Sequence, residues 1–310
     1  IYLVVLAHLI ERLGRSDWGR LFTFAAACFA TYLTTFSNTF NNHTVAAYTA
    51  LFAVAPILCG RLSPAGFAVS GLFAGLTAAF ELPATAFAVA LGVVALTINW
   101  RRALLWFAPA ALLPIVGQLA LNYAEFGDWK PAYEKLDSEW YRYEGSHWNA
   151  QGAARRGIDY AGDRESRPTY AFHLLVGHHG LFSLTPIWLL LLAGYDRIIS
   201  GRWRFDSNWR RVSLATAAVS VIVIVFFAGV VSTVNYGGWT SGPRWFFWLT
   251  PLWLLTILPA ADWLGASRLG RGFAYLLLAF SVFSVSFVGI NPWRHPWIYQ
   301  AMEAWGWKGY

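Results

Sequence analysis

Charged residues are scarce in this sequence of 310 residues: they make up 13% of it, against about 25% in soluble domains. Cysteine is nearly absent, and Cys28 and Cys59 both lie within apolar runs, which excludes a disulfide framework and the close Cys spacing of metal sites. Hydrophobic residues reach 57%, too large a share for a soluble core of this length. Disordered, collagen-like and coiled-coil compositions are excluded as well. The composition indicates a membrane protein.

Apolar runs that approach the length of a membrane span recur along the whole chain. A transmembrane helix needs about 20 predominantly apolar residues. The sequence therefore predicts an all-α, polytopic integral membrane protein with about ten transmembrane helices, the first truncated at Ile1, and one sizeable outer loop. Glu81-Leu82-Pro83 separates two of these helices, because proline restrains the residue before it and starts a new helix well. The runs are 1–11, 21–37, 45–60, 65–80, 83–98, 103–122, 174–195, 212–234, 245–263 and 272–290.

Arginine marks one set of loops. Basic residues near span ends collect on the cytoplasmic side, and here they occupy every second loop, whereas the short alternate loops contain only Arg244. We therefore predict that an outer loop, 123–173, and an outer tail, 291–310, flank the transmembrane regions 1–122 and 174–290. The tail is expected to form a helix on the membrane surface. The bias toward arginine and alanine suggests a bacterial chain, and hence the inner (cytoplasmic) membrane.

Polar residues at membrane depth gather at the predicted outer ends of the spans. Ionisable groups are costly there, so each is a functional candidate. The first group comprises Asn42 and His43 in the first outer turn and Glu81 in the second, and we predict that these residues bind substrate. Two structural alternatives stay open. The Asn-His turn could be a hydrated helix cap, and the negative charge of Glu81 could interact favourably with the dipole at the N-terminus of the helix 83–98.

The adjacent residues His178 and His179 form the second candidate group. Neighbouring histidines point in different directions on a helix, and no HxxxH or HExxH pattern accompanies them, which argues against a zinc site. Their flanking residues Gly177 and Gly180 instead predict a break before a span that begins near Leu181. Imidazoles at such a break suit proton handling or hydrogen bonding to a phosphate or a sugar hydroxyl. The alternative is a pair of interfacial histidines without a chemical role.

The outer turn 235–244 is rich in glycine, so its backbone can approach a ligand closely. It contains Tyr236, which we also expect to contact substrate, and Arg244. Guanidinium binds phosphate through two parallel hydrogen bonds, which makes Arg244 the best candidate for binding an anion. The competing interpretation is an arginine that anchors the helix at the lipid head groups.

These outer motifs together resemble those of the GT-C superfamily of polytopic glycosyltransferases. The similarity lies near the protein mannosyltransferase and aminoarabinose transferase branch, and more closely with uncharacterised planctomycete-type bacterial members. It extends along most of the chain. The motifs that carry it are the Asn-Asn-His turn 41–43, Gly71–Leu76 with Glu81-Leu82-Pro83, the run Gly177–Pro186, and Tyr236-Gly237-Gly238 with Gly242-Pro243-Arg244.

The resemblance implies a polyprenyl-phosphate sugar donor and an acceptor that attacks at the outer face. It also implies an acidic residue in the first outer loop that acts as base or metal ligand. That loop would precede Ile1, so no catalytic residue is named in this sequence. One position departs from the family, because relatives often have Lys or Arg where this chain has Glu81. A carboxylate there would repel a donor phosphate unless it binds a metal or the sugar.

The expected function is therefore transfer of a sugar from a polyprenyl-phosphate donor to an acceptor at the outer face. The expected partners are this donor and membrane lipids, with no nucleic acid. No certain cofactor is predicted, and a divalent metal ion is the one candidate. Two alternatives belong to other functional classes: a transporter or flippase for a lipid or glycolipid, and a non-catalytic subunit of a membrane complex.

Overall fold

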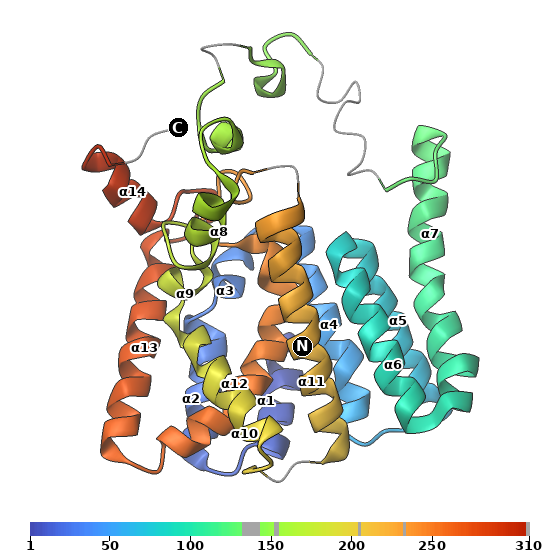
Figure 1. Cartoon of the computed structure of the whole chain (residues 1–310). Coiled ribbons are helices and arrows are strands. Elements are labelled where there is room, and N and C mark those ends of the chain that lie inside the picture. Colours follow the sequence, from blue (N-terminus) through green and yellow to red (C-terminus); the bar gives the residue numbers. More distant parts are fainter. Residues whose placement is uncertain (132–142, 152–154, 204–205, 232–233, 308–310) are drawn as a thin grey trace.

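The computed structural model describes residues 1–131, 143–151, 155–203, 206–231 and 234–307, and these residues include no β-strand. Most of the helices stand roughly parallel in one bundle (Figure 1). The α-helices are α1 (Tyr2–Leu13), α2 (Asp17–Phe29), α3 (Tyr32–Phe36), α4 (Asn42–Leu58), α5 (Pro64–Phe80), α6 (Thr85–Arg102), α7 (Ala108–Phe126), α8 (Arg167–Leu175), α9 (Leu181–Leu184), α10 (Leu190–Ile199), α11 (Ser207–Val225), α12 (Thr250–Leu264), α13 (Arg268–Phe287) and α14 (Trp297–Ala304). Shorter 3-10 helices are η1 (Leu82–Ala84), η4 (His147–Asn149), η6 (Ile158–Asp163), η7 (Pro186–Leu189) and η9 (Arg244–Leu249), and the π-helical turns are η2 (Ala103–Phe107) and η8 (Phe226–Val230).

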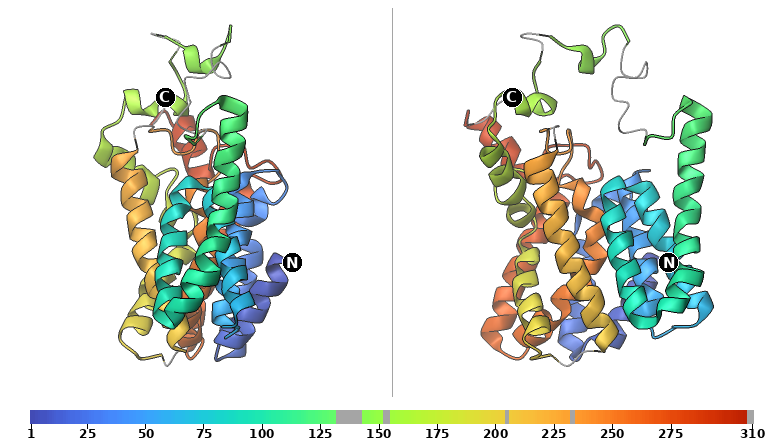
Figure 2. Two further views of the ribbon diagram at one scale, coloured as in Figure 1. Left: turned by 90° about the vertical axis from the view of Figure 1, so that its right-hand side faces the viewer. Right: turned by 45° about the vertical axis from the view of Figure 1, so that its right-hand side comes forward.

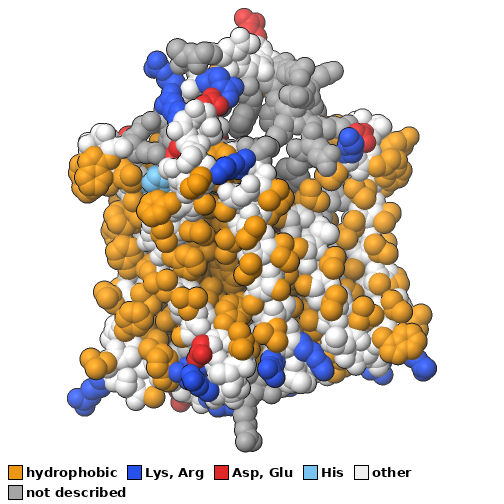
Figure 3. Space-filling model, in the orientation of Figure 1, with side chains coloured by type: hydrophobic (Ala, Val, Ile, Leu, Met, Phe, Trp, Pro, Cys, Tyr) orange, Lys and Arg blue, Asp and Glu red, His pale blue; other side chains and the backbone are white. Residues whose placement is uncertain are grey.

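The all-helical prediction is confirmed for the described residues, but the prediction of ten crossings is not. In the part of the chain that the structure describes, four helical segments are long and apolar enough to cross a membrane: 82–126, 207–230, 244–264 and 268–287. The helices α4 and α5 are also apolar but shorter, and the other predicted crossings stay a prediction. Hydrophobic side chains cover the middle of the face seen in Figure 3, while Lys and Arg gather at its lower edge and near its top. This distribution is typical of a membrane protein.

Two predicted spans are broken in the structure. The stretch 21–37 divides at Ala30 and Thr31 into α2 and α3, and 174–195 divides into α8, α9, η7 and α10. The expected break at Gly177–Gly180 is present, since a turn there separates α8 from α9. Pro186 causes the next break, because proline disfavours the helical conformation of the residue before it: Thr185 has φ −128° and ψ 71°.

Two reversals bring α5, α6 and α7 side by side, as the views of Figures 1 and 2 show. The first is the predicted break at Glu81, where α5 ends and η1 begins. The second lies within the segment 82–126, where Asn99 leaves the helical conformation (φ −157°, ψ 99°). Gly71 and Gly75 then let α5 approach the backbone that runs through η2 into α7: an added Cβ would lie 2.2 Å from the carbonyl oxygen of Phe107 and 2.0 Å from that of Ala111, respectively.

The arginines that mark alternate loops meet at one end of the bundle, here called the basic end. The Nε of Arg12 donates to the carbonyl of Leu58 (3.0 Å), and the guanidinium of Arg15 lies 4.0 Å from the ring centroid of Trp203. The buried carboxylate of Asp262 in α12 accepts from the backbone N–H groups of Arg15 (3.0 Å) and Ser16 (2.8 Å). These contacts confirm that the basic loops share one end.

The opposite end holds the described parts of the loop 123–173. The segments 143–151 and 155–163 stand above the bundle in the views of Figures 1 and 2, and α14 lies at the same end. The helix expected in the tail is therefore present. Positions 132–142, 152–154 and 308–310 of the predicted loop and tail lie outside the described residues. Almost all of α12 is buried, and it packs against α2, α4, α10 and α13. It is therefore the central helix of the core.

Candidate functional site

The structure brings the first predicted group together at the end of the bundle opposite the basic end. His43 and Glu81 are both buried, and the Nδ1 of His43 contacts the Glu81 carboxylate. The side-chain amide of Asn42 donates to the same carboxylate oxygen and to the carbonyl of Phe80, both at 2.9 Å. The helix cap is a different residue, Asn41, whose side chain accepts from the backbone N–H of Thr44. Asn42 and His43 therefore tie the start of α4 to the end of α5.

Replacing this carboxylate should destabilise the bundle. We expect Glu81→Ala to lower the free energy of unfolding by about 1.5–3 kcal/mol, the usual cost of losing hydrogen bonds to a charged group. The buried imidazole of His43 then loses an acceptor that water cannot easily replace. The measurement is the midpoint of thermal unfolding in detergent, with Glu125→Ala, an exposed position in α7, as control. Equal midpoints for the two variants would contradict a stabilising role of Glu81.

The second predicted group lies in the turn between α8 and α9. His178 and His179 are completely buried, and the ring of Tyr236 lies 4.9 Å and 5.2 Å from their ring centroids. The ring of His173, from α8, stacks on His178 at 4.0 Å with an interplanar angle of 20°. The argument that the adjacent histidines point apart is wrong, because they lie in a turn and not in a helix: their Nδ1 atoms are 2.5 Å apart.

Glycine makes this turn possible. A Cβ at Gly177 would lie 2.2 Å from the Nδ1 of His173, and one at Gly180 would lie 2.4 Å from the Oγ of Ser183. Real Cβ atoms do not approach other atoms so closely, so a larger residue at Gly177 would push the turn away from α8, and one at Gly180 would displace Ser183 of α9. Gly177 therefore allows the imidazoles of His173 and His178 to stack, and Gly180 allows the turn to close against α9.

The loop 235–244 places Tyr236 against these histidines. Three consecutive residues, Tyr236 (φ 56°), Gly237 (φ 90°) and Gly238 (φ 73°), adopt positive φ values. Glycine does so at little cost, whereas a tyrosine in this region is strained, and such strain is concentrated at functional sites. The Tyr236 ring is fully buried, and its hydroxyl donates to the carboxylate of Glu165.

Arg244 begins η9 at the end of the same loop. It is half-buried, its guanidinium lies 5.4 Å from the ring centroid of Trp293, and a Cβ on Gly237 would lie 3.2 Å from its Nε. Burial raises the pKa of Asp159, and the nearby imidazole of His147 and guanidinium of Arg244 oppose this rise. Arg244 therefore lies among loop residues and a carboxylate, at the end that holds the histidines.

A cavity of about 540 Å³ opens beside this loop, between the segment 157–158 and α14. Its wall includes aromatic rings: Trp239 and Tyr299 lie 4.5 Å and 4.3 Å from the ring of His295. Burial lowers the pKa of His295 to about 4, so this imidazole is neutral at neutral pH. The lining residues are Gly157, Ile158, Trp239, Arg294, His295, Tyr299, Gln300, Glu303 and Ala304.

The predicted residues thus form two groups and not one. Asn42, His43 and Glu81 make the first, and His178, His179 and Tyr236 make the second, with Arg244 in the same loop as Tyr236. The element η9 connects the groups, since its Phe247 lies 6.4 Å from the ring of His43. Sequence reasoning missed three contributors to the site: Glu165, His295 and Tyr299. It grouped His173 with His178 and His179, as polar residues at the entry to one predicted span, but did not include His173 among the substrate-binding residues.

The chain matches no protein-family model, no curated protein and no solved structure.

Proposed function

We propose that this protein is a membrane-embedded glycosyltransferase that moves a sugar from a polyprenyl-phosphate donor to an acceptor at the outer face of the membrane. One observation carries the proposal. A guanidinium, buried imidazoles and a cavity with aromatic walls lie at the same end of an apolar helical bundle. A lipid-linked donor needs this combination, because its chain stays in the bilayer while its phosphate and sugar reach the polar end.

The reaction breaks the bond between the anomeric carbon and the phosphate oxygen, and polyprenyl phosphate leaves with the bonding electrons. The acceptor hydroxyl forms the new bond to that carbon and gives its proton to a base. Arg244 would hold the leaving phosphate through paired hydrogen bonds. Little covalent chemistry is asked of the protein, because positioning and charge stabilisation supply most of the rate.

The remaining predicted residues take supporting roles in the proposal. His178 or His179 would bind the donor or transfer a proton, and Asn42, His43 and Glu81 would contact the sugar or a metal ion. The cavity of about 540 Å³ lies within the range of ordinary ligand pockets, and the ring faces of Trp239 and Tyr299 suit the apolar C–H surfaces of a sugar. A bacterial inner membrane, with the loop 123–173 and the C-terminus outside, belongs to the same proposal.

The test is sugar transfer by the full-length protein in proteoliposomes, with a panel of radiolabelled polyprenyl-phosphate sugars and acceptor lipids or peptides. The expected result is a labelled product that depends on the protein. Movement of an intact donor between leaflets without any product would identify a flippase and overturn the proposal. No product with any donor of the panel, from folded protein, would also contradict it.

A further inference from the structure

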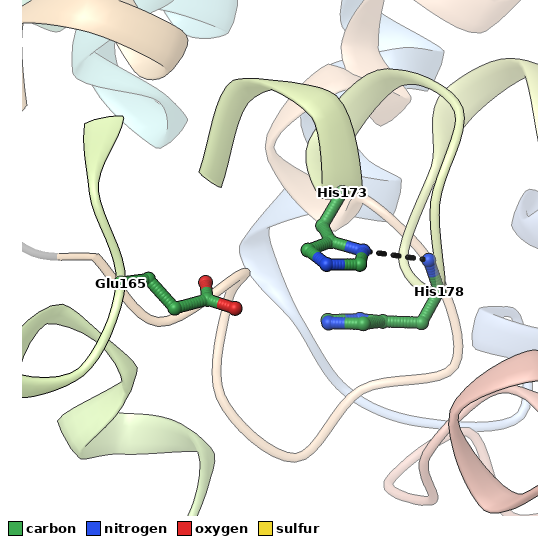
Figure 4. Close-up of side chains that lie close together, drawn as sticks. All are labelled: Glu165, His173 and His178. Carbon is green, nitrogen blue, oxygen red and sulfur yellow. Dashed lines mark hydrogen bonds between the residues drawn. The ribbon is translucent and has the colours of Figure 1, made fainter. Parts of the chain in front are cut away.

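Three metal-ligating side chains converge beside the loop 235–244 (Figure 4). One ligand atom from each of Glu165, His173 and His178 lies within 4.8 Å of the other two. They come from three local contexts: Glu165 precedes α8, His173 lies in its last turn, and His178 lies in the turn that follows. Both histidines are buried and Glu165 is partly so.

The imidazoles present suitable nitrogens. The Nδ1 of His178 contacts the Nδ1 of His179, so a proton on His178 Nδ1 leaves the lone pair on Nε2 for a metal. The Nδ1 of His173 accepts from the backbone N–H of His178 at 3.5 Å, which is long for a hydrogen bond. In this tautomer the proton of His173 is on Nε2, so binding of a metal at Nε2 would move the proton to Nδ1 and give up this weak bond. Figure 4 shows the carboxylate of Glu165 on the side of the stacked rings away from this bond. Nε2 is therefore the atom that each ring would offer.

The surroundings of the cluster supply the outer hydrogen bonds that metal sites need. The hydroxyl of Tyr236 donates a hydrogen bond to the Glu165 carboxylate, and this bond fixes the orientation of that ligand. A second observation is independent of the three ligands. The Nε2 of the fully buried His179 and the Nδ1 of the buried His295 have no hydrogen-bond partner among the described residues. Buried polar atoms are normally satisfied, so a polar ligand or ordered water belongs in this region.

We propose that Glu165, His173 and His178 bind a Zn²⁺ ion. Two imidazole nitrogens and one carboxylate are the three protein ligands of many catalytic zinc sites, which keep a fourth position open for water or substrate oxygen. Ligand atoms about 2.1 Å from zinc lie roughly 3.4 Å apart in a tetrahedron, so zinc binding must bring the ligand atoms closer. It must also turn the stacked rings of His173 and His178, whose planes differ by only 20°, until their nitrogen lone pairs converge on one point. Zinc is preferred over Mn²⁺ and Fe²⁺ because nitrogen ligands bind it more tightly and because it accepts few ligands.

This metal centre goes beyond sugar transfer and does not depend on it. Sequence reasoning had dismissed zinc at the pair His178–His179, and that argument considered only those two residues. The proposed ligand set combines His178 with His173 and Glu165. The sequence alone does not show that these three side chains lie close together. The open position would take a water molecule or a phosphate oxygen.

The experiment is metal analysis of the full-length protein, purified in detergent without chelators or a histidine tag. We expect about one zinc ion per chain, and a higher thermal midpoint when Zn²⁺ is added to chelator-stripped protein. Glu165→Gln keeps an acceptor for Tyr236, and His173→Phe keeps a ring that can stack on His178, so both variants should fold. Each should lose bound zinc and the thermal response. The control His8→Phe, at an exposed histidine of α1, should retain both.

A weaker variant tests the outer hydrogen bond. Tyr236→Phe should lower zinc affinity by roughly ten- to a hundred-fold without removing a ligand, as seen for the partners of other metal ligands. Three results would overturn the zinc site: no zinc and no thermal response in the unmodified protein, full zinc content in folded Glu165→Gln and His173→Phe, or stoichiometric binding of another metal in place of zinc. A protein that binds zinc but transfers no sugar would uphold this inference and contradict only the proposed function.

Discussion

Under the proposed function, Arg244→Lys should reduce sugar transfer by roughly ten- to a hundred-fold, which corresponds to about 1.5–3 kcal/mol for a lost charged hydrogen bond. Lysine keeps the positive charge but not the planar pair of donors that matches a phosphate. The setting of Arg244 strengthens the expectation, because Gly237 packs against its side chain and Trp293 lies near its guanidinium. The initial rate of transfer from a radiolabelled polyprenyl-phosphate sugar is the measurement.

Arg268→Lys is the matched control, since Arg268 is an exposed arginine at the start of α13, far along the bundle from η9. It should transfer sugar at the rate of the unmodified protein. An Arg244→Lys rate within about two-fold of that rate would remove Arg244 from the site, because a lysine anchors at lipid head groups about as well as an arginine. It would also weaken the assignment of the loop 235–244 to donor binding.

Gly75→Leu should prevent stable assembly of α5, at a cost of at least about 3 kcal/mol, the upper part of the range for overpacking. A Cβ on Gly75 would lie 2.0 Å from the carbonyl oxygen of Ala111 and 2.8 Å from the Cγ of Pro114. The obstruction is backbone, so a side-chain rotation cannot relieve it, and α5 and α7 must separate. The yield of monodisperse protein in detergent and its thermal midpoint should both fall sharply.

Gly117→Leu provides the comparison on the opposing helix. Gly117 is an exposed residue of α7, and nothing lies within 4 Å of a Cβ added there. This variant adds the same side chain to an apolar helix without changing its packing, so yield and midpoint should match those of the unmodified protein. Equal behaviour of the two leucine variants would show that the close approach of α5 to α7 is dispensable.

Local rules predicted much of the helical organisation. Glu81-Leu82-Pro83 ends one helix and starts the next, as the conformational limits of proline require. The glycines at 177 and 180 mark the turn before α9 in the same way. The simple length rule failed at the predicted span 174–195, because the glycines at 177 and 180 and the proline at 186 divide it into short helices that a count of apolar residues does not reveal.

The candidate site was predictable only in part. Asn42, His43 and Glu81 could be singled out because polar groups at membrane depth are rare, and their contact follows from the hairpin of α4 and α5. The contact between His178 and His173 could not be predicted, because the stacking of their rings depends on the turn geometry that Gly177 permits.

The sequence by itself determined that this protein is helical and apolar and that its arginines alternate between loops, because composition and local conformational preference act over a few residues. Only the tertiary structure decided which polar groups meet. Tyr236 reaches Glu165 across 71 positions of chain, and the buried His179 lies beside the ring of His295 from the tail. Such pairings depend on how distant helices pack, which no local pattern encodes, and they create the cluster of Glu165, His173 and His178 with its supporting hydrogen bonds.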